Sequence, residues 1–300
     1  LRRHEAELMF LDLNMPEMDG YQVLEQIREE DLPVMTIVVS GDIQPEARDR
    51  VKKLGALDFI KKPTETCTVL DLLVEYGVYR PGELEDSALQ DSSLKSIGSA
   101  APEISVSLND YLQEISNVAM GRSSDLLARL LRVFVKQPIP KVAFLANSEL
   151  HMAISSVSDS DTYSAVCQGF TGAGIAGEAL LLFADASFRE MAEMLHYDTL
   201  VGEAVNVEVL MDMSSILFGA FLKGIGDQLD LKLSLGHPTV LGQHRQITEL
   251  LEHHSAREEQ LLCIEICYAL EDRDIECDML ILLTEDSVPF LEDRLQYLVD

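Results

Sequence analysis

The sequence predicts two domains of different class: an α/β domain with a parallel sheet, followed by an α+β domain built from an internal repeat. In the first part, short apolar runs alternate with helix-like segments, which is typical of parallel strands joined by crossover helices. In the last two thirds, one pattern of spaced residues occurs twice. Between these parts Gly, Pro, Ser and acidic residues dominate without a period, which indicates a linker. The expected boundaries are 1–78, 79–105 and 106–300.

The first domain is predicted to alternate three strands with three helices. The apolar runs are short and uninterrupted enough for buried parallel strands, and they cover residues 8–13, 34–39 and 57–60. The segments between and after them have helical spacing, and they cover residues 21–29, 45–54 and 69–76. Gly55 stands where the second helix should end.

The second domain contains two copies of one unit, about 106–200 and 204–300, which predicts internal pseudo-two-fold symmetry. The first copy reads Asp110-x3-Glu114-x2-Asn117-x22-Pro140. The second reads Glu208-x3-Asp212-x2-Ser215-x22-Pro238, and each of its positions lies 98 residues after its counterpart. Gly121 and Gly219 keep the same offset. Each copy should form a long helix, then strands, then a second helix.

Composition excludes several classes of partner. The formal net charge of -29 repels phosphate backbones and anionic lipid, so we expect neither nucleic acid nor a membrane surface as a partner. No apolar run approaches the roughly 18 residues of a membrane span. The five cysteines are scattered, which favours buried thiols in a reducing, cytoplasmic compartment.

Three chemically active side chains are expected to meet at one edge of the first sheet. Asp12, Ser40 and Lys62 each stand at the carboxyl end of a predicted strand, where open α/β sheets place their ligands. A carboxylate, a hydroxyl and an ammonium group together suit a phosphorylated carboxylate, with Asp12 as acceptor and the other two bonding phosphoryl oxygens.

These residues resemble a response-regulator receiver domain, a flavodoxin-like fold. The resemblance is carried by Asp12-x2-Met-Pro-x-Met-Asp-Gly20, by the Ser-Gly strand end and by Lys62-Pro with Phe59 three residues earlier. It implies that Asp12 is the phospho-acceptor, Ser40 the switch hydroxyl, Lys62 the phosphate-sensing lysine and Phe59 the rotating aromatic. It also implies Mg²⁺, held by Asp12 and the backbone carbonyl of Asn14, and an upstream histidine kinase.

The match covers about residues 5–77, so it corresponds to the last three βα units of a receiver. The acidic pair that receivers carry after their first strand has no counterpart in this chain. We therefore expect a partial receiver with weak Mg²⁺ binding, and no phosphotransfer to Asp12 unless the preceding part is restored.

In the second domain, Asp110, Glu114 and Asn117 are spaced i, i+4 and i+7, so they share one helical face. Leu112, Ile115 and Ala119 of the same helix should face the core. The polar stripe is either a solvated helix face or a surface presented to another molecule.

The pattern resembles the CheC/CheX/FliY family of chemotaxis phosphatases, which hydrolyse the aspartyl phosphate of CheY-like receivers. The resemblance implies that Asn117 orients the attacking water and that Glu114 pairs with the receiver lysine. It leaves Asp110 and Pro140 in supporting roles. The second copy, with Glu208, Asp212, Ser215 and Pro238, is a degenerate site that we expect to be inactive.

Two functions are compatible with this pattern. The first is a response regulator with phosphatase output in two-component signalling. Its substrate is either a separate CheY-like receiver, which we prefer, or the chain's own receiver, and a homodimer is possible. The second is a non-catalytic receiver-binding module, similar to the flagellar switch proteins. A transcription factor is disfavoured because no helix-turn-helix pattern or basic surface is evident.

Overall fold

The computed structural model describes residues 6, 8–79, 107–146, 150, 162–197, 203–247, 249–250, 260–273 and 275–299. Apart from Tyr79, the linker expected over residues 79–105 lies outside this part of the chain.

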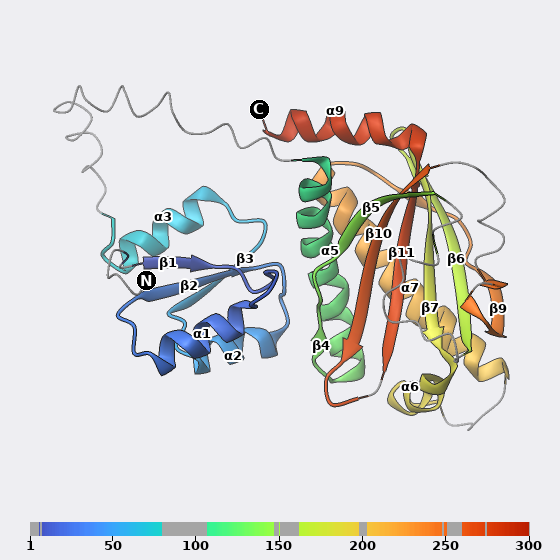
Figure 1. Ribbon diagram of the computed structural model, residues 1–300, viewed down its shortest axis with the longest axis horizontal. Coiled ribbons are helices and arrows are strands. Elements are labelled where there is room, and N and C mark those ends of the chain that lie inside the picture. The colour runs from blue at the N-terminus through green and yellow to red at the C-terminus, as the bar shows by residue number, and fades with distance from the viewer. Residues whose placement is uncertain are drawn as a thin grey trace.

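The N-terminal part has the predicted parallel sheet. Its strands are β1 (Leu8–Leu11), β2 (Met35–Ser40) and β3 (Asp58–Lys61), paired in the order β1-β2-β3. The helices are α1 (Gly20–Glu29), α2 (Pro45–Lys53) and α3 (Thr66–Glu75), and Figure 1 shows them around the sheet. Each element lies within three residues of its predicted bounds. Leu11, Leu24 and Val38 are buried in the core between them.

The C-terminal part is an antiparallel sheet of eight strands with long helices. The strand order is β4-β10-β11-β7-β6-β8, with β5 pairing β10 and β9 pairing β6. The strands are β4 (Val135–Lys136), β5 (Lys141–Ala146), β6 (Tyr163–Gly172), β7 (Ile175–Ala184), β8 (Ser234–Leu235), β9 (Thr239–Arg245), β10 (Gln260–Leu270) and β11 (Glu276–Thr284). The helices are α5 (Leu108–Leu131), α6 (Phe188–Met194), α7 (Glu203–Leu229) and α9 (Val288–Val299). The predicted α+β class is confirmed.

The internal repeat is visible in the sheet. β7 and β11 pair at its centre, and Leu180 lies directly opposite Leu280. The two long helices end alike, because Arg132 and Asp230, which follow α5 and α7, both have a left-handed backbone with φ of 55° and 51°. This turn ends α5 at Leu131 and α7 at Leu229.

α5 and α7 pack closely on one face of this sheet. A Cβ atom on Gly224 would lie 2.9 Å from the Cα of Ala119, so only glycine allows the two helices to approach so far. Gln228 of α7 also donates a 2.8 Å hydrogen bond to the carbonyl of Ile115. Ala204–Leu229 is long and apolar enough to span a membrane by composition alone, but here it is a core helix with Val209, Met213 and Leu217 fully buried.

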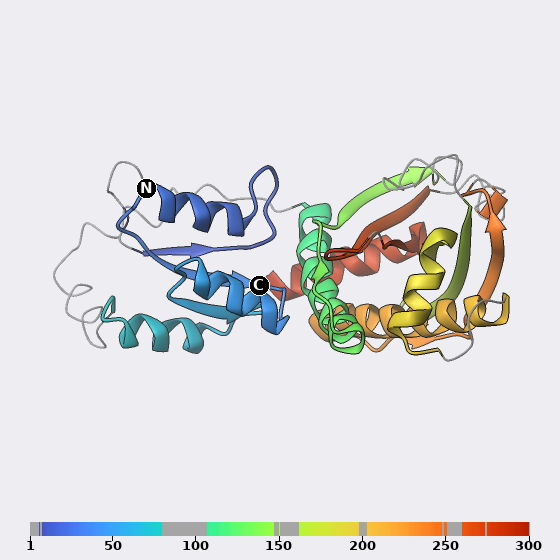
Figure 2. The same cartoon turned by 90° about the horizontal axis from the view of Figure 1, so that it is seen from below.

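α5 is the element on which the two parts of the chain meet. In both views it lies between the parallel sheet and the antiparallel sheet (Figure 1, Figure 2). One face of the helix packs into the C-terminal core through residues such as Leu112 and Ala119, as predicted. The opposite face is turned toward the loops that follow β1, β2 and β3.

Adjacent leucines on α5 test this arrangement. Leu127 is 1% exposed and Leu126 is 50% exposed. Leu127→Ala should lower the free energy of unfolding by about 2–5 kcal/mol, because it removes buried methyl groups and leaves a cavity. Leu126→Ala is the matched control and should change it by about 0.5 kcal/mol or less. Urea denaturation measures both, and equal losses would contradict the described orientation of α5.

Candidate functional site

Asp12 and Lys62 meet at the carboxyl edge of the parallel sheet, as the sequence predicts. Asp12 follows β1 and Lys62 follows β3, and the Nζ of Lys62 lies 2.6 Å from Oδ2 of Asp12. Ser40, the last residue of β2, is fully buried between them. Its Oγ accepts a 3.1 Å hydrogen bond from the backbone N–H of Asp42 and thus holds the loop after β2.

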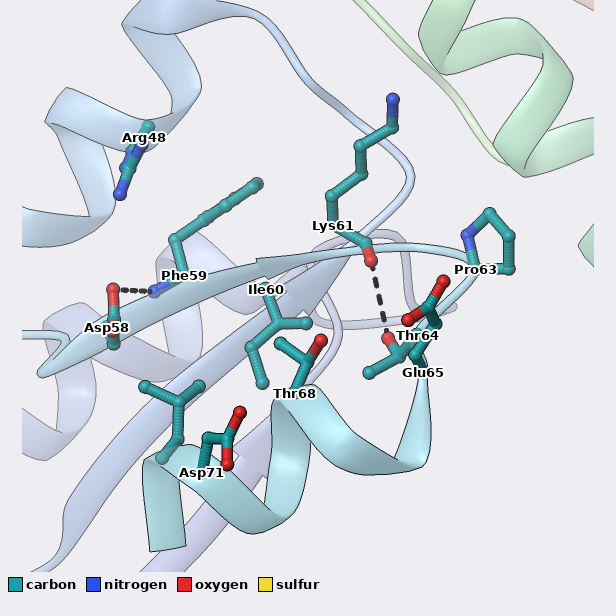
Figure 3. Close-up of a pocket in the computed structure, with 11 residues that line it drawn as sticks. Arg48, Asp58, Phe59, Ile60, Lys61, Pro63, Thr64, Glu65, Thr68 and Asp71 are labelled. Atoms are coloured by element: carbon teal, nitrogen blue, oxygen red, sulfur yellow. Dashed lines mark hydrogen bonds between the residues drawn. The ribbon is translucent and has the colours of Figure 1, made fainter. Parts of the chain in front are cut away.

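Phe59 lies away from this edge. Its side chain lines a surface pocket of about 600 Å³ together with Arg48 from α2 and Asp71 from α3 (Figure 3). Asp12, Ser40 and Lys62 do not line the pocket. The pocket therefore lies along the outer edge of β3, with lining residues from both α2 and α3, and is separate from the paired Asp12 and Lys62.

Glu114 and Asn117 of α5 reach this same edge. Oε1 of Glu114 lies 2.8 Å from the Nζ of Lys62, so the lysine bridges two carboxylates. Oδ1 of Asn117 accepts a 2.6 Å hydrogen bond from the side-chain amide of Asn14, two residues after Asp12. Asn117 is only 3% exposed, because the N-terminal part of the chain covers it. The two residues singled out on the helix are thus brought against the predicted acceptor site.

The electrostatics of Lys62 follow from this position. Burial disfavours its charge, but the hydrogen bonds to Asp12 and Glu114 outweigh that effect and raise the pKa of Lys62. The ammonium group therefore stays protonated, and it neutralises negative charge at the edge.

The two supporting residues have local roles in the structure. Asp110 and Ser107 form a reciprocal capping box at the start of α5, in which the Asp110 carboxylate accepts from the backbone N–H of Ser107 at 3.2 Å. These bonds lower the pKa of Asp110. Pro140 is buried immediately before β5. Among the described hydrogen bonds and ion pairs, none joins Asp110 or Pro140 to Lys62 or Asp12. Glu114 and Asn117 are the members of the predicted stripe that reach the edge of the parallel sheet.

Two glycines allow the parts to touch backbone to backbone. A Cβ on Gly121 of α5 would lie 1.9 Å from the carbonyl oxygen of Gly41, in the loop after β2. A Cβ on Gly41 would lie 3.2 Å from the carbonyl oxygen of Asn117. Any side chain at position 121 would displace the loop, so Gly121 sets how deeply the N-terminal part sits on α5.

A glutamine clamp holds the loop beside this contact. Gln44 is fully buried, and its side-chain amide donates to the carbonyl of Val135 at 2.8 Å. The backbone N–H of Val135 donates back to Oε1 of Gln44 at 2.9 Å. The side chain thus pairs with β4 as a neighbouring strand would. It is also bonded to Asp42, whose N–H is held by Ser40.

An arginine of the N-terminal domain makes a further contact with the C-terminal domain. Arg50 of α2 makes two hydrogen bonds to the carboxylate of Glu271, one of them 2.9 Å long between Nη1 and Oε1. Its guanidinium group lies 4.1 Å from the centre of the Phe134 ring. The hydrogen bonds lower the pKa of Glu271 and raise that of Arg50. Bidentate pairs and cation–π contacts of this kind are more specific than a surface ion pair.

Sequence reasoning did not identify this second set of contacts, made by Gly41, Gln44, Arg50, Phe134, Val135 and Glu271. We call it the anchor. Of these residues, only Gly41 belongs to a motif noted in the sequence, the Ser-Gly strand end. Its partner Gly121 belongs to the repeat.

Residues 1–73 match the family model described as the response regulator receiver domain. This segment is a receiver domain. Curated relatives agree: the transcriptional regulatory protein FixJ of Bradyrhizobium diazoefficiens is 24% identical over 46% of this chain and 68% of its own length. The probable C4-dicarboxylate response regulator DctR of Bacillus subtilis is 30% identical over 32% of this chain, and the match spans less than half (43%) of its own length.

Solved structures align with a larger share of the chain. FliY of Thermotoga maritima covers 63% of this chain and 96% of its own at 14% identity, with a TM-score of 0.48. The chemotaxis protein CheX of Vibrio vulnificus covers 57% and 96% at 13% identity, with a TM-score of 0.39.

The receiver edge offers few ligands for a magnesium ion. Mg²⁺ prefers oxygen ligands in an octahedron and is held by carboxylates, phosphates and water. Asp12 and the carbonyl of Asn14 are available, but Asp12 is paired with Lys62. No group of three acidic, histidine or cysteine side chains that could hold a metal occurs among the described residues. These residues do not form a complete magnesium site.

The second copy presents its counterparts to solvent. Glu208, Asp212 and Ser215 are all exposed on α7. Asp212 accepts a 2.7 Å hydrogen bond from Tyr197, which raises the pKa of that tyrosine to about 12. The hydroxyl of Ser215 donates to the carbonyl of Met211 in its own helix. A Cβ on Gly219 would have no neighbour within 4 Å among the described residues. Pro238 immediately precedes β9, as Pro140 precedes β5.

Asp42 makes the docked state sensitive to pH. Burial raises its pKa from 3.8 to about 6, against the hydrogen bonds from Gln44, and the nearby Asp125 carboxylate adds to the rise. A raised folded-state pKa means that Asp42 contributes stability below pH 4 and loses it as pH rises through 6.

Asp42→Asn should therefore flatten part of the pH dependence. The wild type should lose about 1–2 kcal/mol more than the variant in the free energy of unfolding between pH 5 and pH 7, since one pKa unit corresponds to about 1.4 kcal/mol. Asparagine keeps the oxygen that accepts from Gln44, so the clamp is retained. Urea denaturation at both pH values measures the difference, and parallel curves for the two proteins would contradict the assignment.

Proposed function

We propose that the C-terminal domain of this chain is a phosphatase that hydrolyses the aspartyl phosphate of a receiver domain in two-component signalling. Glu114 and Asn117 carry the activity. Glu114 pairs with the receiver lysine and sets the register of docking, and Asn117 orients the attacking water. The protein acts downstream of a histidine kinase, in the cytoplasm.

One observation carries this proposal: the helix α5 already holds both residues against a receiver's reacting edge. Glu114 contacts Lys62, which contacts Asp12 in turn, and Asn117 contacts Asn14. A solvated polar face, the plainest alternative for the stripe, does not explain why Asn117 is buried there. A carboxamide is suited to the task, because its oxygen accepts from a water and its nitrogen donates to a phosphoryl oxygen.

The reaction needs positioning and little else. An acyl phosphate on Asp12 is a mixed anhydride, and its carboxylate is a good leaving group. The oxygen of a water forms a bond to phosphorus, the bond from phosphorus to the Asp12 oxygen breaks, and its electron pair stays on the carboxylate. The water's proton passes to phosphate or solvent, leaving inorganic phosphate. Lys62 offsets the phosphoryl charge, and Asn117 holds the water in line.

A non-catalytic binding module is the second candidate function. The exposed second copy favours it, because Asp212 is bonded to Tyr197 and Ser215 to its own helix, so neither is poised toward a water. That copy resembles a face kept for contact without chemistry. In the first copy, the same candidate would make Asn117 a docking residue only.

Asn117→Ala separates the two functions. If Asn117 orients the water, the variant should dephosphorylate a receiver about 10²–10³ times more slowly, which is the usual effect of removing one well-placed polar group. Ser215→Ala, at the matching position of the second copy, should leave the rate unchanged. The measurement follows loss of ³²P from Asp12 after labelling with a small phosphodonor, in protein in which the preceding part of the receiver is restored, because phosphotransfer to Asp12 is expected only there.

The docked state needs to be checked in the same variant. Protection of the Gly41 loop in amide hydrogen exchange should survive in Asn117→Ala, because the anchor contacts remain. Unchanged hydrolysis with retained docking would remove the catalytic role and leave the binding module as the function.

A further inference from the structure

We propose that the substrate of this phosphatase is the receiver of its own chain, and that the anchor selects it over separate receivers. The inference rests on the proposed function and names its substrate. Phosphorylated Asp12 would be hydrolysed by Glu114 and Asn117 of the same molecule, so that the chain limits the lifetime of its own signal.

The catalytic face of α5 is already occupied. The loop after β2 lies on Gly121 so closely that no Cβ fits, and Asn117 has almost no exposed surface. A separate receiver could reach Glu114 and Asn117 only after the chain's own receiver had left. Docking from within the chain also has a high effective concentration, because the two domains are tethered.

The contacts at the reacting edge do not by themselves select a receiver. Every receiver is expected to carry an aspartate at the position of Asp12 and a lysine at the position of Lys62. Glu114 contacts only that lysine, so it would pair with any receiver. The anchor is different in kind. Gln44 and Arg50 lie in the loop after β2 and on α2, and they touch neither Asp12 nor Asn117. They are identity elements of this particular receiver.

The second copy shows that the anchor is built on one face only. Phe134 corresponds to Lys232, two residues after the left-handed residue that follows each long helix. Glu271 corresponds to Ala173, counted from the equivalent ladder pairs Ala269 with Lys136 and Thr171 with Ser234. A lysine in place of the ring and an alanine in place of the carboxylate would repel Arg50 or leave it unpaired. The face on α7 therefore cannot hold this receiver in the same way.

A mixing experiment decides between hydrolysis within and between chains. Asn117→Ala protein in which the preceding part of the receiver is restored is labelled on Asp12 with a ³²P small phosphodonor. It is then mixed with an excess of unlabelled Asp12→Ala protein of the same length, whose Asn117 is intact. We expect the label to be lost no faster than from Asn117→Ala protein alone. We also expect the first-order rate constant of the wild type to stay the same over a 100-fold range of protein concentration. Rapid loss of label on mixing, or a rate proportional to concentration, would overturn the proposal.

A charge swap tests the anchor. Arg50→Glu and Glu271→Arg should each slow loss of phosphate from Asp12 by about 10-fold or more, and the double variant should recover most of the rate because the pair re-forms with reversed signs. Arg245→Glu, on the exposed edge strand β9, is the control and should have no effect. Rescue distinguishes docking from misfolding, since a misfolded single variant would not be restored.

The result also separates this inference from the function on which it rests. If Asn117→Ala abolishes hydrolysis but neither charge reversal slows it, the phosphatase function is supported and the role of the anchor in selecting the receiver is contradicted. If Asn117→Ala has no effect in any format, the phosphatase itself falls. Arg50→Glu could instead accelerate hydrolysis of a separate phosphorylated receiver while Asp12 keeps its phosphate. The docked receiver would then be an inhibitor that blocks Glu114 and Asn117, and the proposal would be overturned.

Discussion

The contact on which the arrangement depends is the Lys62 ammonium held between Asp12 and Glu114. One cation serves two carboxylates from two domains, and it is mostly buried, with 17% of its side chain exposed. Such a bridge is stronger than a pair in open solvent because the screening by water is reduced. Glu114 is half exposed, and Lys62 is its one ion-pair partner among the described residues, so it depends on Lys62 for its place at this edge. The bridge therefore ties the contact between the two domains to the pairing of Lys62 with Asp12.

Positions 114, 117 and 121 lie on one face of α5, and each makes a different physical contribution to the contact. Glu114 supplies charge, Asn117 supplies a carboxamide and Gly121 supplies the lack of a side chain. The missing side chain at Gly121 is what allows Glu114 and Asn117 to reach the receiver. Because the loop after β2 rests on the helix backbone itself, the two polar side chains need to bridge only a short gap to the edge of the sheet. A bulkier residue at position 121 would lift the loop away and lengthen every contact above it.

The sequence was sufficient to predict those features that leave a periodic or spaced pattern. Strand runs, helical spacing and the 98-residue repeat gave the fold classes, and the i, i+4, i+7 spacing put Asp110, Glu114 and Asn117 on one face. The anchor could not be predicted this way. Gln44 and Val135, or Arg50 and Glu271, are polar or ordinary residues in distant segments, and no local pattern states which surfaces meet. Asp110 was placed correctly on the helix, but its carboxylate turns back to Ser107, a local choice that spacing does not reveal.

The two halves of the C-terminal domain share a core and differ where a receiver would touch. Leu180 and Leu280 meet at the centre of the sheet, so a change on either side of the pseudo-axis disturbs both copies. The outer faces of α5 and α7 have no such constraint. On α7 the carboxylate of Asp212 and the hydroxyl of Ser215 are satisfied within the domain, and the space over Gly219 is open among the described residues. If the chain's own receiver is the substrate, as proposed, one receiver face is enough, and the second copy then has only the shared core to maintain.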